Sequence, residues 1–333
     1  MKPEPNRNWF FIKFQSDSLD EASFASLVQA KTGSDKFSLK QKLGRIVLNL
    51  LFRFLPLKWQ LGLLDVIKQR RSGPVHRSPA TFFISTLIGE KKISLQPAYP
   101  NHREFFIGLT FDIDNKIDYH LLPDLVEDLV KHGLTATINL VTHTDYTISS
   151  SFITDLQRSG FEIGLHGDTH NTALAFLPKP IIKAKLQRAV DRLGFIPYGY
   201  RTPGLSFSPN LVTGLDELGF VYDSSLTTGI AMYRSIEFPY VFRFPGSRLL
   251  EVPLFMQDYN FFVNDLYSEA AALAILSEQL DEIKKINGVA VINLHPIMIH
   301  HRKHFRSELV RLLLSYKKTA HISTIYDLVK HIE

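Results

Sequence analysis

Cysteine is absent from this 333-residue chain. Disulfide bonds and thiolate catalysis are therefore excluded, and any metal ion must be held by histidines and carboxylates. The absence of cysteine mildly favours a reducing compartment. The first residues, MKPEPNRNWFFIKFQSDSLDEASF, also lack the apolar core and cleavage site of a secretory signal. These two absences predict a cytoplasmic protein.

Long uninterrupted apolar runs are also missing. The most lipophilic stretch, RIVLNLLFRFLPLKWQLGLLDVI, is broken by Arg53, Pro56 and Lys58. It falls short of the roughly 20 clean apolar residues that a membrane-spanning helix needs. We therefore expect no transmembrane helix.

Acidic residues are scarce in one region, residues 36–77, which contain ten Lys or Arg residues and a single acid, Asp65. The formal charge of that region is +9. Because the whole chain has a net charge of +5, the remaining residues together carry −4. Because the basic charge is confined to one segment and no recognition motif accompanies it, a general nucleic-acid binder is not expected.

Apolar residues recur at helical spacing within this basic region: Leu39, Leu43, Ile46, Leu50 and Phe54. Residues 1–100 are therefore predicted to form a basic, mainly helical N-terminal extension. Two interpretations of residues 36–77 remain open. The helices pack on the following domain with their basic face in water, or they contact an anionic membrane peripherally, at its cytoplasmic face.

Short apolar runs alternate with helix-period segments from about residue 104 onward. Expected strands are FFIGLTFDID, LTATINLV, FEIGL, PYGYRTPG, FVYDSSL, LLEVPLF and VAVINLHP, and segments of helical period separate most of them. Some seven βα units with short connections predict a parallel sheet that either closes into a barrel or stays open and doubly wound. We favour the first for residues 101–333, as a distorted or incomplete (β/α)7 barrel.

Unusual polar residues stand where these strands end. The set is Asp112 and Asp114, His166 and His170, Arg201, Asp223, and His295. In such barrels the carboxyl ends of the strands converge and carry the chemistry. Asp112 and Asp114 share one face of a strand, so their charges need a cation, a shared proton or solvent. Two imidazoles with a carboxylate form a recurrent divalent-metal set.

Two further polar candidates have plainer interpretations. Asp168, between the two histidines, is better explained as a cap or as a partner of a ligand than as a ligand itself. His300 and His304 repeat the HxxxH spacing, but they lie in the polar stretch HHRKH with no carboxylate nearby in sequence. We expect a solvated basic loop there.

Five short motifs follow one another in order: TFDID (110–114), HGDTH (166–170), RTPG (201–204), DSSL (223–226) and NLHP (293–296). Together they resemble the polysaccharide deacetylases, the NodB-homology domain of carbohydrate esterase family four. The resemblance implies that Asp114, His166 and His170 hold a divalent metal, Zn²⁺ or a similar ion.

The resemblance also implies a role for each remaining residue of the set. Asp112 would be the general base, and Arg201 would orient it. A backbone N–H near Gly204 would help to stabilise the oxyanion. His295 would protonate the leaving amine, and Asp223 would hold and charge-tune that imidazole.

Three positions depart from the family pattern. The first motif is DxD where many relatives have adjacent aspartates, which leaves open which carboxylate is base and which is ligand. Leu226 stands where Trp is common, and Asn293 stands where Leu is common; both positions tend to line the acyl pocket. The acyl group and the sugar are therefore not predicted from the motifs.

The expected function is a metal-dependent hydrolase of a linear amide C–N bond. It would remove an N-acyl group, acetyl being the expected one, from an amino sugar in glycan or glycolipid biosynthesis. The substrate would be a glycan, a nucleotide-linked sugar or a lipid-linked sugar. The alternatives are another C–N hydrolase on the same scaffold, such as a deformylase of a lipid-linked sugar, and a catalytically inactive glycan-binding module.

Overall fold

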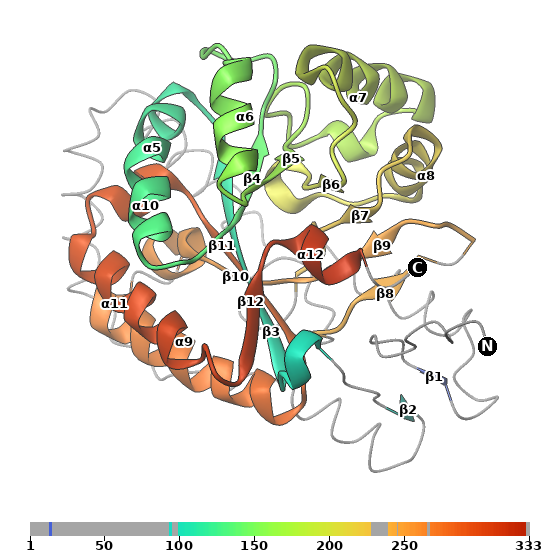
Figure 1. Cartoon of the computed structure of the whole chain (residues 1–333). Helices are drawn as coiled ribbons and strands as arrows, with labels where there is room; N and C mark the ends of the chain where they lie inside the picture. Colours follow the sequence, from blue (N-terminus) through green and yellow to red (C-terminus); the bar gives the residue numbers. More distant parts are fainter. Residues whose placement is uncertain are drawn as a thin grey trace, which may run out of the picture.

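The computed structural model describes residues 13–14, 93–94, 99–227, 239–244, 246–264 and 267–330 (Figure 1). Before residue 99 these include only two short strands, β1 (Lys13–Phe14) and β2 (Ile93–Ser94), which pair antiparallel. The basic region 36–77 lies outside the described residues. The N-terminal extension and its boundary at residue 100 therefore stay predictions.

One curled sheet organises the rest of the chain, in the order β10–β11–β3–β4–β5–β6–β7–β9–β8, with β12 pairing beside β3. Its strands are β3 (Phe105–Ile113), β4 (Thr137–Leu140), β5 (Glu162–Leu165), β6 (Gly199–Tyr200), β7 (Tyr222–Asp223), β8 (Phe242–Arg243), β9 (Leu250–Glu251), β10 (Leu254–Gln257), β11 (Val289–Leu294) and β12 (Ala320–Ser323). All pairings are parallel except β8 with β9.

The sheet closes at a single point. Leu254, at the start of β10, forms a parallel bridge with Thr227, and its N–H donates to the carbonyl of Leu226 at 2.7 Å. Because β10 pairs with β11 on its other side, this bridge completes the ring. The architecture is a distorted (β/α) barrel, which confirms the predicted fold class.

Helices surround the curled sheet (Figure 1). They are α5 (Lys116–Lys131), α6 (Ser150–Arg158), α7 (Lys179–Leu193), α8 (Pro209–Leu218), α9 (Glu269–Lys285), α10 (Pro296–His300), α11 (Lys303–Ser315) and α12 (Ile325–Val329), with short turns η1 (Pro100–His102), η2 (Leu174–Phe176), η3 (Pro203–Leu205) and η4 (Asn260–Asn264). Gly194 and Gly219 end α7 and α8 in the left-handed conformation that favours glycine. Among the described residues, no helix is long and apolar enough to cross a bilayer.

Strand β3 is the centre of the core, and all nine of its residues are buried. One edge pairs with β11, while the other pairs with β12 over Phe105–Gly108 and then with β4 over Thr110–Ile113. Strand β12 and α12 therefore close the amino-terminal end of the barrel. The carboxyl ends of β3, β4 and β11 remain together at the opposite end, where the polar residues lie.

Two details of the sequence-based prediction are wrong. The run LLEVPLF was expected to be one strand, but it forms β9 and β10, separated by Val252 and Pro253. Proline has no N–H for a sheet ladder, which explains the break. The stretch HHRKH is not a loop, since His300 ends α10 and His304 lies in the first turn of α11.

Candidate active site

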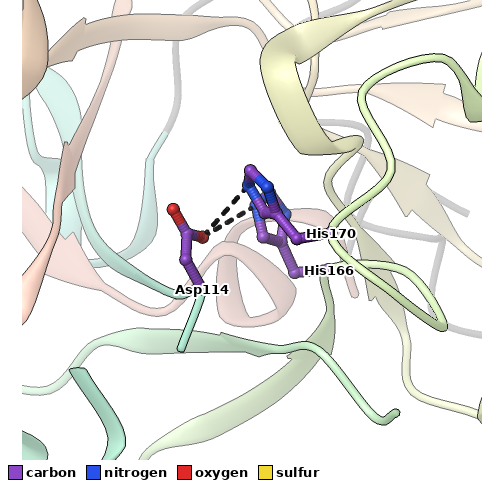
Figure 2. A group of neighbouring side chains, drawn as sticks. All are labelled: Asp114, His166 and His170. Carbon is purple, nitrogen blue, oxygen red and sulfur yellow. Dashed lines mark ion pairs between the residues drawn. The ribbon is translucent and has the colours of Figure 1, made fainter. Parts of the chain in front are cut away.

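Three side chains meet at the carboxyl end of β3 and β5. His166 Nε2 lies 3.3 Å, and His170 Nε2 lies 3.4 Å, from the same atom, Asp114 Oδ1 (Figure 2). Tetrahedral zinc with bonds of about 2.0–2.1 Å separates its ligand atoms by about 3.4 Å. Within the described ranges, this is the one group of three metal-ligand side chains whose ligand atoms converge. The spacing therefore fits a tetrahedral cation.

Local structure explains why these three residues converge. Asp114 follows the last residue of β3, and the next residue, Asn115, caps α5 with its side chain, so the chain turns sharply at the carboxylate. Gly167 has φ +91, and a Cβ there would lie 2.9 Å from the carbonyl oxygen of Thr169. Glycine therefore permits the tight exit from β5 that turns His166 and His170 toward Asp114.

Hydrogen bonds set the histidine nitrogen that faces Asp114. The Nδ1 of His166 lies 2.9 Å from the backbone carbonyl of Arg201, which can only accept, so Nδ1 carries the proton. Nε2 then offers a lone pair toward Asp114, as a metal-binding imidazole requires. Burial lowers the pKa of His170 below its usual range and so favours the neutral ring. At His166 burial also lowers the pKa, but the carboxylates of Asp112 and Asp114 outweigh it and raise the pKa overall.

Asp114 itself has the features of a ligand. Its Oδ1 is buried and has no hydrogen-bond donor, although an isolated buried carboxylate oxygen is costly. Burial would raise the pKa of Asp114, but His166, His295 and His170 outweigh it and hold the pKa well below its usual range. The residues present therefore fit a divalent cation between Asp114 and the two histidines.

Asp112 is held beside this group as a buried carboxylate. Its Oδ2 is 4.0 Å from His166 Nε2, and its Oδ1 is 3.3 Å from Nη1 of Arg201, whose side chain is fully buried. Burial would raise the pKa of Asp112, but Arg201, then His166 and His295, lower it overall. Arg201 therefore contacts Asp112, as the motif comparison predicted.

His295 faces the other oxygen of Asp114, with its Nε2 3.9 Å from Oδ2. Its Nδ1 is 2.7 Å from Oδ1 of Asp258, and its backbone N–H donates to Oδ2 of Asp258 at 2.6 Å. Burial would lower the pKa of His295, but Asp258 outweighs it and raises the pKa well above its usual range. The imidazolium is thus stabilised, as a proton donor requires.

Asp223 was expected to hold His295, but the carboxylate that contacts His295 is Asp258. Asp223 accepts a hydrogen bond from Ser225 and stands opposite Glu251 in the pairing of β7 with β9. Burial raises the pKa of Asp223 to about 7. The prediction that Asp223 holds His295 is wrong, because β11 has β10 as its neighbour, and Asp258 directly follows β10.

Asp168 is not part of the converging group. It is fully buried and forms ion pairs with Lys185, at 3.2 Å, and with Arg188, both on α7. Its Oδ1 also accepts the backbone N–H of Thr169 at 2.8 Å. Asp168 therefore ties the loop that carries both histidines to a helix, in line with a partner's role.

Residues 109–307 match the family model of the WbmS-like polysaccharide deacetylases. The chain belongs to this family. It is thus a hydrolase of the polysaccharide deacetylase type that acts on an amide bond. The family implies that the substrate is a carbohydrate. No curated protein matches the chain.

Solved structures share the fold of this WbmS-like deacetylase. A protein assigned as a polysaccharide deacetylase from Mycobacterium smegmatis has a TM-score of 0.56 at 20% identity, covering 71% of this chain and 92% of its own. A similar assignment from Pseudomonas aeruginosa PAO1 gives 0.54 at 13%, covering 70% and 92%. The PuuE allantoinase gives 0.53 at 14%, covering 70% and 91%.

Two positions that depart from the family pattern, Leu226 and Asn293, lie in the core of this deacetylase. Leu226 and Asn293 are both fully buried. Asn293 donates to Asp112 Oδ2 at 2.7 Å, and the backbone N–H of Leu226 donates to Glu251. Asn293 is therefore a direct partner of Asp112.

The motif search missed Asp258 and Asn139 in this deacetylase. Asp258 directly follows the apolar strand β10, as Asp114 directly follows β3, but the strand was expected to end at Phe255. Asn139 interrupts the apolar run of β4 and donates to Asp112 Oδ1 at 2.8 Å. A polar residue inside a fully buried strand was the available signal for Asn139.

Proposed function

We propose that the protein is a metal-dependent hydrolase that removes an N-acetyl group from an amino sugar in glycan or glycolipid biosynthesis. One observation carries the proposal. Two groups lie close to the candidate cation ligands: the carboxylate of Asp112, 4.0 Å from His166 Nε2, and the imidazole of His295, whose Nε2 is 3.9 Å from Asp114 Oδ2. Amide hydrolysis needs a base for the attacking water and an acid for the leaving amine on opposite sides of the scissile bond.

Asp114, His166 and His170 would hold the metal ion. When bound, a divalent ion of this kind lowers the pKa of water and polarises a carbonyl oxygen. Asp112 would accept the proton of the attacking water at Oδ2, the oxygen that faces His166. Arg201 keeps that carboxylate ionised and oriented through its contact with Oδ1.

His295 would donate a proton from Nε2 to the leaving nitrogen. Its Nδ1 contacts Asp258 at 2.7 Å, which orients the ring so that Nε2 points toward Asp114. The backbone N–H near Gly204, the last residue of RTPG, is the candidate for the oxyanion contact, since Gly204 is exposed and has a φ of +67, which favours glycine. Asp258 takes the role first expected of Asp223.

A second hydrolase function has one specific observation in its favour. An allantoinase shares the fold, so the scaffold supports C–N bonds other than N-acetyl groups. A deformylase of a lipid-linked sugar is therefore the alternative within the same chemistry. An inactive glycan-binding module is disfavoured, because the side chains that would serve as metal ligands, base and acid are all present in this sequence.

The composition suggests where the reaction takes place. Absence of cysteine favours the cytoplasm. The +9 segment at residues 36–77 would bring the protein to an anionic membrane surface, where lipid-linked precursors are presented. A nucleotide-linked or lipid-linked amino sugar is therefore our preferred substrate class.

Acetate and formate release tests the proposal. The purified full chain, with and without added Zn²⁺, is incubated with N-acetylated and N-formylated amino sugars in free, oligomeric, nucleotide-linked and lipid-linked form. We expect metal-dependent acetate release that His166→Ala abolishes and that His304→Ala, at an exposed position of α11, leaves unchanged. Formate release alone would favour the deformylase, and release of neither acid with any metal would refute the proposal.

A further inference from the structure

Asp112 is surrounded by polar side chains from its own strand, β3, and from the neighbouring strands β4 and β11, and one of them, Asn139, lies outside the five motifs. We propose that Thr110, Asn139 and Asn293 are positioning residues that aim one oxygen of Asp112 at the attacking water. The inference rests on the proposed function, in which Asp112 is the base. All three side chains are almost completely buried.

The hydrogen bonds of Asp112 leave one acceptor position free. A carboxylate offers about four lone-pair positions, two on each oxygen. Oδ1 accepts from Asn139 at 2.8 Å and from Arg201 at 3.3 Å, and Oδ2 accepts from Asn293 at 2.7 Å. The remaining position is on Oδ2, the oxygen nearest to His166 Nε2. A base held in this way can accept a proton only from the side of the metal ligands.

The direction of the Asn293 hydrogen bond is set by a chain that starts at Arg201. A guanidinium can only donate, so Thr110 Oγ1 accepts from Arg201 Nη1 at 2.7 Å. The single Thr110 hydroxyl hydrogen can then be donated to Asn293 Oδ1 at 2.8 Å or to the carbonyl of Ile292 at 3.3 Å, and the contact with Asn293 is the shorter one. The amide NH₂ of Asn293 must therefore point at Asp112. A hydroxyl at position 110 thus decides which end of the amide meets the base.

Asn139 is fixed by a close approach of two strands. It pairs with Asp112 in the β3–β4 ladder and with Gly164 in the β4–β5 ladder. A Cβ at Gly164 would lie 2.2 Å from Asn139 Oδ1, closer than real Cβ contacts. Glycine at position 164 therefore leaves room for the Asn139 amide in the position from which it donates to Asp112.

Strand register makes these positions rigid. Thr110 and Asn293 face each other across β3 and β11, just as Asp112 and Asn139 do across β3 and β4. A stable core could be made at positions 139 and 293 with apolar residues, since buried amides need partners that apolar side chains do not. The amides at positions 139 and 293 instead suit a buried, ionised base, because they donate to Asp112 and leave one of its acceptor positions free.

The first test compares two matched substitutions at one position. Thr110→Val removes the hydroxyl but keeps the shape, and Thr110→Ser keeps the hydroxyl. We expect Thr110→Val to lower kcat by about 10-fold to 100-fold, because small misplacements of a reacting group have effects of that size. KM and bound Zn²⁺ should stay within twofold of wild type. Thr110→Ser should restore kcat.

Gly164→Ala supplies a second variant that leaves every catalytic group chemically intact. We expect it to lower kcat with unchanged metal content, because the Asn139 amide must turn away. The inference is overturned if folded Thr110→Val and Gly164→Ala both keep wild-type kcat. If Thr110→Val fails to fold, Gly164→Ala alone decides by the same criterion.

Crystal structures separate failure of this inference from failure of the proposed function. If the wild-type protein releases no acetate from any substrate, the proposed function fails. The position of Asp112 in Thr110→Val and Gly164→Ala crystals then decides the inference. Rotation of the Asp112 carboxylate supports it, and an unchanged carboxylate with unchanged amides contradicts it.

Discussion

Replacing Asp258 by Asn should disable the proposed acid while the proposed metal site stays intact. Asp258 is fully buried and accepts two N–H groups of His295, one from the ring and one from the backbone. An amide offers only one acceptor atom, so one of these donors loses its partner. The charge that stabilises the imidazolium is lost as well.

The magnitude follows from the type of bond. A hydrogen bond to a charged group contributes about 1.5–3 kcal/mol, and about 1.4 kcal/mol corresponds to a tenfold change in rate. Since Asp258 is shielded from solvent, we expect kcat to fall between about 10-fold and about 150-fold. Metal content should not change, because Asp258 does not touch Asp114, His166 or His170.

The pH profile gives the sharper readout. Asp258 raises the pKa of His295, so removing the carboxylate lowers that pKa. The protonated acid is then lost at a lower pH, and the alkaline limb of kcat against pH should move to lower pH. The assay is acetate release from pH 5 to 10, with bound Zn²⁺ measured on the same samples.

Asp223→Asn is the matched control. Asp223 is equally buried but contacts Ser225 and not His295. The alkaline limb of kcat against pH for Asp223→Asn should coincide with that of the wild-type protein. If Asp223→Asn moves the alkaline limb and Asp258→Asn does not, Asp258 is not the partner of the acid and the roles derived from the geometry are reversed.

Three further predictions address the metal ligands, the base and the N-terminal segment. His166→Ala should lose bound Zn²⁺ and turnover together, whereas His304→Ala should lose neither in the same metal analysis. Asp112→Asn should keep the metal and lose most of kcat, while Asp114→Asn should weaken metal binding itself, which titration with Zn²⁺ measures; reversed phenotypes would exchange base and ligand. Residues 36–77 should make the chain co-sediment with anionic vesicles at low salt, less so at high salt, and not after deletion of the segment; a folded chain that ignores anionic vesicles at low salt contradicts this.

Strand ends could be located from the sequence because apolar runs and polar interruptions are local signals. They identified Asp114, His166 and His170, which the structure brings together, and Arg201, which contacts Asp112. The alternation of strands and helices likewise predicted the barrel. These features depend only on which residue follows which.

Partnerships across the sheet could not be predicted in the same way. Asp223 is the last residue of β7 and Asp258 directly follows β10, and only the strand order shows that β10 is the neighbour of β11. Asn139 and Asn293 become partners of Asp112 through the registers of β4 and β11 against β3. A one-residue slip in either register would point the amides elsewhere.

An anomalous diffraction measurement on crystals of the full chain soaked in Zn²⁺ tests the central claim most directly. The claim is that Asp114, His166 and His170 hold the cation beside Asp112 and His295. The account predicts one strong anomalous peak within about 2.0–2.2 Å of Asp114 Oδ1 and both histidine Nε2 atoms. A peak elsewhere, or none at these atoms under saturating Zn²⁺, would contradict it.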